Sequence, residues 1–305
     1  MKRRQLFILF GSPWLLASLA AFFLLGGGTP VGGADLPEIR QQGELRHLGV
    51  SYANFVTGSG DGLDVDLIKL FAQHLGVRYR YVETSWKEVL ADLTGKKVRP
   101  RGEGVEVIGQ VPIKGDLVAN GLTILPWREK VVNFSTPVFP TQVWLIARAD
   151  SALKPIKPSG RPDRDIAAVK ALLMGQTVLG KFDTCLDPRL YHLEKVRARV
   201  KDFQGTLNEL AQALIKGDAE MTMLDVPDAL MALEKWPGRI KVIGPISSKQ
   251  EMGVAFAQTS PQLRETFNRF FDQIKQDGTY LALVRRYYPS ALHHFPEFFA
   301  EFQTR

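Results

Sequence analysis

Short apolar runs alternate with amphipathic segments along the chain from about residue 45 onward. Eight runs are rich in β-branched and aromatic residues, which predicts strands at 47–52, 77–82, 116–124, 143–148, 177–181, 220–224, 240–243 and 253–257. The segments between them carry apolar residues three and four positions apart, as surface helices do. Strands that alternate with helices indicate an α/β fold with largely parallel pairing.

Capping residues mark the start of two of these helices. Asp64 is the expected N-cap of a helix that ends at Gly76, because a short acidic side chain accepts from free backbone N–H groups. Thr206 and Glu209 have the spacing of a capping box and open a second helix that continues to about Ile215.

The first 34 residues have the layout of a secretory leader. Basic residues 2–4 precede an apolar run over 6–25, and small residues follow up to Ala34. We expect cleavage after Ala34 and a periplasmic location. The apolar run is also long enough to remain as a membrane anchor, so retention of the leader stays open.

Charge and cysteine content narrow the function further. The formal net charge is +7, and without the three leader cations 36 basic residues face 32 acidic ones. The remaining net charge of +4 is spread along the sequence and excludes a polyanion-binding surface. The densest basic cluster, in residues 96–101, is expected in a loop. Cys185 has no partner for an intramolecular disulfide, so the fold depends on its core.

Common catalytic and metal-binding signatures are missing. The chain has no P-loop, no zinc-type spacing among its five histidines and no glycine-rich dinucleotide fingerprint. The acidic stretch 61–66 lacks the glutamate that closes a calcium loop, since Ala72 stands at that position. We therefore expect no metal, no cofactor and no nucleic-acid partner.

Several segments resemble the family 3 bacterial solute-binding proteins, the periplasmic receptors for polar amino acids. The sequence GLTILPWR at 121–128, followed by VNFSTP at 132–137, is similar to the family's arginine motif. GLDVDL at 62–67, GDAEMTMLD at 217–225 and DGTY at 277–280 match further motifs in the family's order. The same module forms the N-terminal half of some membrane-bound lytic murein transglycosylases.

The resemblance implies a two-lobed, type II periplasmic-binding-protein fold. Each lobe is expected to hold a mixed, mostly parallel sheet flanked by helices, with two crossing strands as the hinge. The implied boundaries are a signal peptide at 1–34, lobe 1 at 35–142 plus 252–305, and lobe 2 at 143–251. Ligand capture would close the two lobes of a monomer.

The resemblance also assigns the polar centre of the cleft. Arg128 is expected to clamp a ligand carboxylate through its planar guanidinium, with the Thr123 hydroxyl as a neighbouring donor. Asp225 is expected to take the ligand's α-ammonium group. The alternatives are an ion pair between Arg128 and Glu129, and a helix-capping role for Asp225.

Five further residues are predicted to line the cleft. Tyr52 and Trp86 are expected to sandwich the ligand's side chain, although plain core packing is the alternative. Thr184 and Cys185 are expected at the start of a helix whose N–H groups attract an anion, with Lys181 close by. These neighbours would lower the pKa of the Cys185 thiol and make it reactive, whereas a buried and inert thiol is the alternative.

Three departures from the family pattern stand out. The first strand lacks an acidic residue near Ser51, Leu125 replaces a second hydroxyl residue, and Asp183 replaces a small glycine. A carboxylate at Asp183 would repel a ligand carboxylate unless a cation compensates. Residues 95–114 look inserted relative to the family and are expected to cover the cleft mouth or dock a partner.

The functional prediction is an exported solute-binding protein that captures an amino acid or similar small carboxylate-bearing ligand for an ABC transporter. One alternative is a sensor or regulatory module related to lytic transglycosylases, because the sequence after the matched region is too short for their catalytic domain. A periplasmic dehydratase on the same scaffold is the other, with Asp183, Lys181 and Asp225 as candidate acids.

Overall fold

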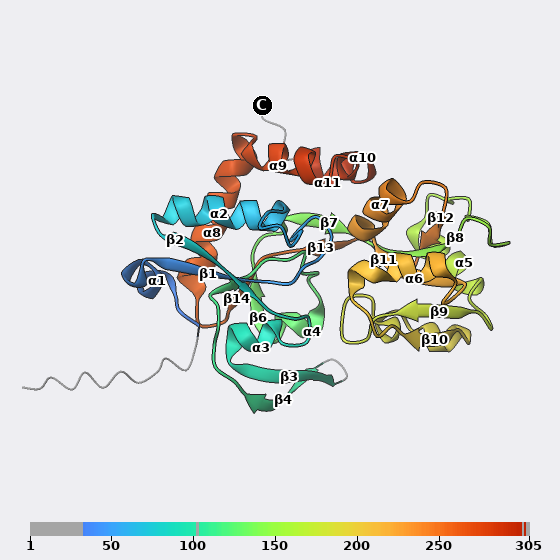
Figure 1. Ribbon diagram of the computed structural model, residues 1–305, viewed down its shortest axis with the longest axis horizontal. Helices are drawn as coiled ribbons and strands as arrows, with labels where there is room; N and C mark the ends of the chain where they lie inside the picture. The colour runs from blue at the N-terminus through green and yellow to red at the C-terminus, as the bar shows by residue number, and fades with distance from the viewer. Residues whose placement is uncertain (1–32, 102–103, 301, 303–305) are drawn as a thin grey trace, which may run out of the picture. The chain divides into compact units, whose positions relative to one another are not determined.

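The computed structural model of the protein describes residues 33–101, 104–300 and 302. The predicted leader at 1–34 lies almost entirely outside these residues. Among the helices that the structure describes, none is long and apolar enough to cross a membrane. Residues 31–305 form one compact unit with two lobes, each built on its own sheet (Figure 1).

The first sheet has the strand order β2-β1-β5-β14-β6. It consists of β2 (Arg78–Glu83), β1 (Glu44–Gly49), β5 (Leu117–Val118), β14 (Ala255–Ala257) and β6 (Val132–Phe134). β1 pairs in parallel with β2 and β5, whereas β14 is antiparallel to β5 and β6. The run at 116–124 was expected to form one long strand, but only two of its residues do, and the rest becomes the loop that leads into the arginine motif.

Helices cover this first sheet and complete the first lobe. The sheet is accompanied by α1 (Leu36–Gln42), α2 (Leu63–Leu75), α3 (Val89–Thr94), α4 (Pro126–Glu129), α8 (Pro261–Gln276) and α9 (Thr279–Tyr287), followed by the short α10 (Ala291–His294) and α11 (Pro296–Ala300). Aromatic rings join the two longest helices, since Phe71 of α2 and Phe267 of α8 are both fully buried with centroids 5.2 Å apart. Chain segments from both ends of the sequence therefore share one core.

The second sheet has the strand order β10-β9-β11-β8-β12. It consists of β10 (Arg199–Asp202), β9 (Thr177–Gly180), β11 (Met221–Asp225), β8 (Val143–Arg148) and β12 (Ile240–Pro245). β9 pairs in parallel with β10 and β11, and β8 is antiparallel to β11 and β12. Each sheet is thus mixed, with equal numbers of parallel and antiparallel pairings rather than a parallel majority. The helical segments of the second lobe are α5 (Pro162–Ala171), α6 (Leu210–Lys216), α7 (Val226–Lys235) and the 3₁₀ turns η1 (Pro188–Tyr191), η2 (Leu193–Val196) and η3 (Leu207–Glu209).

Two short strands cross between the lobes. β7 (Phe139–Thr141) precedes β8 of the second sheet, and β13 (Gln250–Met252) precedes β14 of the first. The two strands pair with each other in antiparallel register, with Gln250 opposite Thr141. The chain therefore crosses between the lobes twice at one place. The first of these crossings follows the arginine motif in the sequence.

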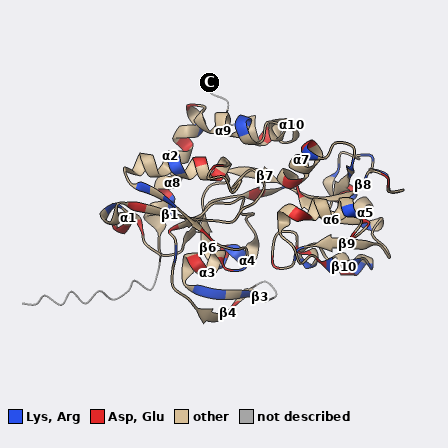
Figure 2. Cartoon of the chain, viewed as in Figure 1, with Lys and Arg blue, Asp and Glu red and all other residues tan. Residues whose placement is uncertain are grey.

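The basic cluster at 96–101 is a strand and not the loop expected from its glycine and proline neighbours. β3 (Lys96–Arg101) and β4 (Gly104–Gln110) form an antiparallel hairpin outside both main sheets. Figure 2 shows Lys and Arg along β3. Cross-strand partners explain the difference, because Arg99 lies opposite Glu106 and forms a 3.0 Å ion pair with it.

The capping predictions had different outcomes. The capping box of Thr206 and Glu209 is confirmed, and η3 and α6 follow it. The assignment of Asp64 as an N-cap is wrong, because α2 begins after Gly62 and Asp64 lies within its first turn. Its Oδ2 accepts a hydrogen bond of 2.7 Å from the backbone N–H of Gly121. Asp64 therefore ties α2 to the loop before the arginine motif.

Candidate functional site

The arginine motif places a buried guanidinium at the junction of the lobes. Pro126 opens α4 at a position where its missing N–H costs nothing, and Arg128 follows two residues later. The Arg128 side chain is 3% exposed, and its Nη1 donates a 2.8 Å hydrogen bond to the backbone oxygen of Thr123. No ion pair joins Arg128 to Glu129 among the described residues.

Two donors of this motif have no hydrogen-bond partner. Neither Nε of Arg128 nor the fully buried hydroxyl oxygen Oγ1 of Thr123 is paired in the described part of the chain. Burial lowers the pKa of Arg128, while the neighbouring Cys185 and Asp225 oppose that shift. An unpaired buried donor costs free energy because it has lost its hydrogen bonds to water. Two such donors in one motif are therefore expected where an anionic ligand group supplies the missing acceptors.

Asp225 ends β11 and is fully buried. It stands at the N-cap position of α7, but its side chain makes no capping hydrogen bond, so the capping alternative does not describe it. Its carboxylate instead accepts from the Tyr52 hydroxyl at 3.2 Å, the Cys185 thiol at 2.9 Å and the Thr141 hydroxyl at 3.4 Å. Burial raises the pKa of Asp225, and the donors and Arg128 offset part of that shift.

The surroundings of Cys185 are those of a buried, inert thiol and not those of a reactive thiol with a lowered pKa. Its thiol is 2% exposed, and burial followed by the negative charge of Asp225 raises its pKa well above the usual value. The expected helix start is also wrong. Residues 181–187 form turns before the four-residue η1, so no α-helix begins at Cys185 to stabilise a thiolate.

Thr184 and Lys181 do not direct their polar groups at the cluster. The Thr184 hydroxyl donates to the backbone oxygen of Lys181 at 2.7 Å, and the Lys181 ammonium donates to the backbone oxygen of Phe203 at 2.9 Å. Asp183 adopts a left-handed conformation with φ 61°, and its largely exposed carboxylate pairs with Arg189 at 2.9 Å. Arg189 therefore compensates the negative charge of Asp183, which was expected to repel a ligand carboxylate.

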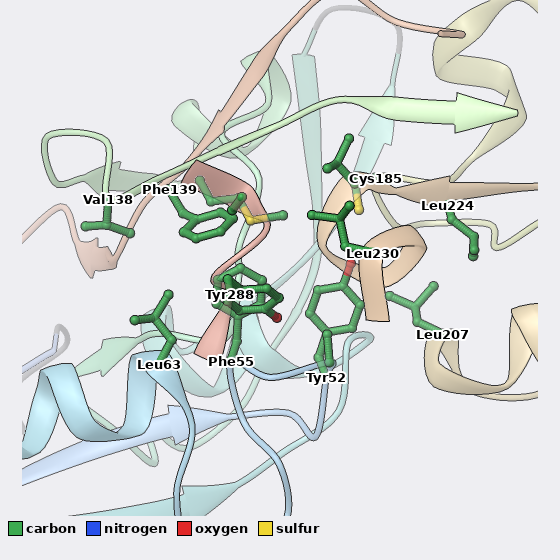
Figure 3. Packing of buried hydrophobic residues seen from close by; sticks show 14 of the residues in the cluster. Tyr52, Phe55, Leu63, Val138, Phe139, Cys185, Leu207, Leu224, Leu230 and Tyr288 are labelled. Carbon is green, nitrogen blue, oxygen red and sulfur yellow. The ribbon is translucent and has the colours of Figure 1, made fainter. Parts of the chain in front are cut away.

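The aromatic pair predicted to sandwich a ligand packs edge to face. The rings of Tyr52 and Trp86 have centroids 5.3 Å apart and planes at 86°. Tyr52 is fully buried, and Figure 3 shows its ring pointing from the first lobe toward Cys185 and Leu230 of the second. In this arrangement Tyr52 supplies a hydroxyl to Asp225 and an apolar wall to the cluster.

The structure thus brings together Arg128, Thr123, Asp225, Tyr52 and Cys185, with Trp86 behind Tyr52. We call the first five residues the junction cluster. Sequence reasoning missed three further members of its surroundings: Thr141, Tyr191, whose hydroxyl donates to the backbone oxygen of Cys185, and Asp228. A carboxylate three residues after Asp225 was a readable signal, whereas the other two carry no local motif.

The β3–β4 hairpin reaches the side of the cluster. A cavity of about 460 Å³ is lined by Arg99 and Pro100 of the hairpin, Trp127 beside Arg128, and a segment of the second lobe. That segment contributes Asp183, Thr184, Asp187, Arg189 and Leu190. The inserted residues therefore form one wall of a space that both lobes enclose.

Comparison with known proteins decides the family. The family model for bacterial extracellular solute-binding proteins, family 3, matches residues 113–290, which include the arginine motif, both crossing strands and Asp225. The chain belongs to this family. The match confirms the resemblance that the motifs indicated.

The sequence relatives of this family 3 protein fall into two groups. It is 29% identical over 264 residues to the membrane-bound lytic murein transglycosylase F of Desulfosudis oleivorans, covering 83% of this chain and 50% of that one. It is 25% identical over 231 residues to the L-cystine-binding protein TcyJ of Escherichia coli, covering 76% and 75%. The chain therefore spans about half the length of the transglycosylase F relatives it matches.

Solved structures confirm the two-lobed fold of the family 3 protein. A mutant of the arginine-binding protein ArgBP from T. maritima superimposes with a TM-score of 0.65 at 24% identity, covering 83% of this chain and 99% of that one. The ancestral amino-acid-binding protein AncCDT-1, described as a precursor of cyclohexadienyl dehydratase, gives a TM-score of 0.64 at 26% identity over 83% and 99%. The type II periplasmic-binding-protein architecture is thereby shown.

Proposed function

We propose that this protein is an exported receptor that captures a small amino-acid-like ligand at the junction cluster. The observation that carries the proposal is the pair of unpaired buried donors, Arg128 Nε and Thr123 Oγ1, close to a buried carboxylate. A guanidinium and a hydroxyl suit a ligand carboxylate, and Asp225 suits an ammonium group. An amino acid carries both groups on one carbon atom.

The ligand class follows from the same charges. Solved structures with this fold hold L-arginine or lysine, and the curated relatives include proteins named for L-cystine and octopine. All of these ligands contain an α-amino acid or a close derivative. We infer that the ligand's carboxylate takes the free donors of the arginine motif and that its ammonium displaces one of the three neutral donors from Asp225.

Lobe closure provides the mechanism. We propose lobe boundaries at 35–142 plus 252–305 and at 143–251, with β7 and β13 as the hinge. Asp225, Cys185 and Tyr52 come from both sides of that hinge, so a ligand held among them favours the closed form over the open one. We further propose that the closed form is recognised by an inner-membrane ABC permease and that the leader at 1–34 directs export.

A thermal-shift screen against amino acids, organic acids, small peptides and muropeptide fragments tests the proposal. A ligand at about a hundred times its dissociation constant adds about 2.7 kcal/mol to the free energy of unfolding. Arg128→Met should sharply reduce the response because it removes the clamp, at a cost to binding of about 2–5 kcal/mol. Arg161→Met, at an exposed site in the second lobe, is the matched control and should respond like the wild type.

The transglycosylase F similarity favours one second candidate, a binding module that senses or regulates cell-wall turnover. It differs from the receptor in its ligand, because muropeptide fragments would then stabilise the protein while free amino acids would not. A dehydratase is a third outcome, and turnover of prephenate by the purified protein would replace the receptor proposal. The matched family model describes solute-binding proteins, and the two solved structures compared above are of binding proteins, so we propose a receptor without catalytic activity.

A further inference from the structure

A second cavity lies near the junction cluster and is lined by Ala53 and Leu224, the chain neighbours of Tyr52 and Asp225. It has a volume of about 230 Å³, and the loop after β1 forms one wall while α6 and α7 of the second lobe form the other. The loop wall contains Ala53, Asn54 and Thr57. This volume is below the range of drug-sized sites, so it suits a ligand the size of an amino acid.

Asp228 lies in the first turn of α7 and lines this cavity. Its side chain is 8% exposed, and its Oδ2 atom is buried without a hydrogen-bond partner in the described part of the chain. An unpaired carboxylate oxygen at such a position is costly in the absence of a cation. The cavity therefore has an acceptor at its buried end.

The charge around Asp228 is not balanced by the residues that surround it. Asp225 has Arg128 nearby, and the positive charge of Arg128 lowers the pKa of Asp225. Asp228 has no ion pair among the described residues, and its pKa is raised well above the usual value by burial and then by the charge of Asp225. The two groups that face it from the first lobe are the hydroxyls of Tyr52 and Tyr288; the Tyr52 hydroxyl offsets part of the rise in pKa, but neither group brings a positive charge.

The outer end of the cavity has the opposite charge. Lys235 and Trp236 line it at the end of α7, with the lysine ammonium 4.8 Å from the indole centroid. Asn208 lies nearby on η3, where its Oδ1 accepts from the backbone N–H of Ala53 at 2.9 Å. Leu207 and Leu224, which are labelled in Figure 3, are two apolar members of the wall. The walls are therefore apolar, with an acid at one end and a base at the other.

We propose that this cavity is a second binding site, for a small zwitterion whose ammonium group binds Asp228 and whose carboxylate faces Lys235. The site is separate from the Arg128 donors and stands whether or not the proposed function of the junction cluster is correct. Because its walls come from both lobes, occupancy also favours the closed arrangement and should tighten binding at the junction cluster.

Nuclear magnetic resonance of the full chain tests this site, with the indole N–H signal of Trp236 as the reporter. Glycine, ethanolamine and acetate are titrated in turn, and Trp236→Phe identifies the reporter signal. Glycine should shift it saturably in the wild type, and the shift should persist in Arg128→Met. Ethanolamine should bind more weakly than glycine, and acetate should leave the signal in place.

Two substitutions sharpen the test. Asp228→Asn should weaken glycine binding at least tenfold, whereas Asp218→Asn, at an exposed position on the same lobe, should leave it unchanged. Lys235→Gln, also exposed, should make glycine and ethanolamine bind equally and keeps the test valid if Asp228→Asn fails to fold. Affinity should rise with pH, because an ammonium ligand binds the ionised form of Asp228 and burial raises the pKa of that group well above its usual value.

Three results would overturn the site. They are a Trp236 signal that moves with neither glycine nor ethanolamine, a glycine response retained in Asp228→Asn, and a response to acetate as strong as that to glycine. A glycine response lost in Arg128→Met but retained in Asp228→Asn would assign binding to the junction cluster alone. That result leaves the receptor proposal intact and removes the second site.

Discussion

Arg46 and Arg128 both lie near a fully buried aspartate, yet their hydrogen bonding differs. Arg46 donates from Nε and Nη2 to Asp116, with a shortest distance of 2.6 Å, and its backbone N–H donates to the same carboxylate at 2.7 Å. Arg128 makes one hydrogen bond to a backbone oxygen and leaves Nε unpaired. The guanidinium of Arg46 is thus paired directly with a carboxylate, whereas that of Arg128 forms no such pair among the described residues.

The difference separates a structural ion pair from a binding group. The Arg46–Asp116 pair joins β1 to the segment just before β5, and each charge is neutralised by the other. Arg128 bears the cost of burial without the compensation that Arg46 receives. A buried charge that stays incompletely bonded marks Arg128 as a candidate binding group, as it does Asp228 in the second cavity.

The largest expected effect compares the two arginines directly. Arg46→Met should lower the free energy of unfolding by about 3–5 kcal/mol, because it leaves Asp116 buried without its partner. Arg128→Met should lower it by less than about 1.5 kcal/mol, since that side chain has few bonds to lose. Urea denaturation followed by tryptophan fluorescence measures both. Equal losses would show that Arg128 is a structural group like Arg46.

The second prediction concerns pH and two buried groups of the first lobe. Burial raises the pKa of Asp64 to about 7 and lowers that of His47 to about 4. The folded state then binds the extra proton at Asp64, so this group's contribution to stability is lost as pH rises from about 4 to 7. The unfolded state binds the extra proton at His47, so its contribution is lost as pH falls from about 6.5 to 4.

These opposite slopes should largely cancel in the wild type. As the pH rises from 4 to 6.5, the free energy of unfolding of Asp64→Asn should increase by about 2–4 kcal/mol, because only the His47 slope remains. That of His47→Gln should decrease by a similar amount over the same range, because only the Asp64 slope remains. Urea unfolding at half-unit pH steps measures the slopes. Parallel curves for both variants would contradict the assignment of the two shifts.

The third prediction tests the hydrogen bond that the Cys185 thiol donates to the Asp225 carboxylate. Cys185→Ala should lower the free energy of unfolding by about 1–2 kcal/mol because it removes one of three donors, whereas Cys185→Ser retains a donor and should lose less. The thiol should react with a disulfide reagent only after unfolding, since it is buried with a raised pKa. Rapid labelling of the native protein would restore the reactive alternative.

The smallest effect compares two fully buried threonines. The hydroxyl of Thr222 donates to the backbone oxygen of Leu179 at 3.3 Å, whereas that of Thr123 has no partner among the residues that the structure describes. Thr222→Val should cost about 1 kcal/mol, while Thr123→Val should be neutral or slightly stabilising before ligand is added. Ligand affinity should fall only in Thr123→Val. Calorimetric titration with a ligand from the thermal-shift screen separates the two.

Much of the fold was readable in the sequence because its signals are local. Alternating strand and helix patterns predicted an α/β protein, and the Thr206–Glu209 spacing predicted a helix start that the structure has. Asp64 misled for the opposite reason. A capping residue is recognised by its neighbours in sequence, but this carboxylate bonds to Gly121, 57 residues away. The β3–β4 hairpin was missed because cross-strand pairing, including the Arg99–Glu106 ion pair, outweighs the effect of a glycine and a proline.

The sequence by itself determined the family and the residue types of the site, since motif order and spacing survive without coordinates. Only the tertiary structure decided which of those residues meet. Arg128, Asp225, Tyr52 and Cys185 converge, while Lys181 and Thr184 satisfy their polar groups on nearby backbone. The reason is physical. Desolvation and hydrogen-bond completion depend on every neighbour in space, and the partners of Asp225 come from 40 to 173 residues away in the sequence.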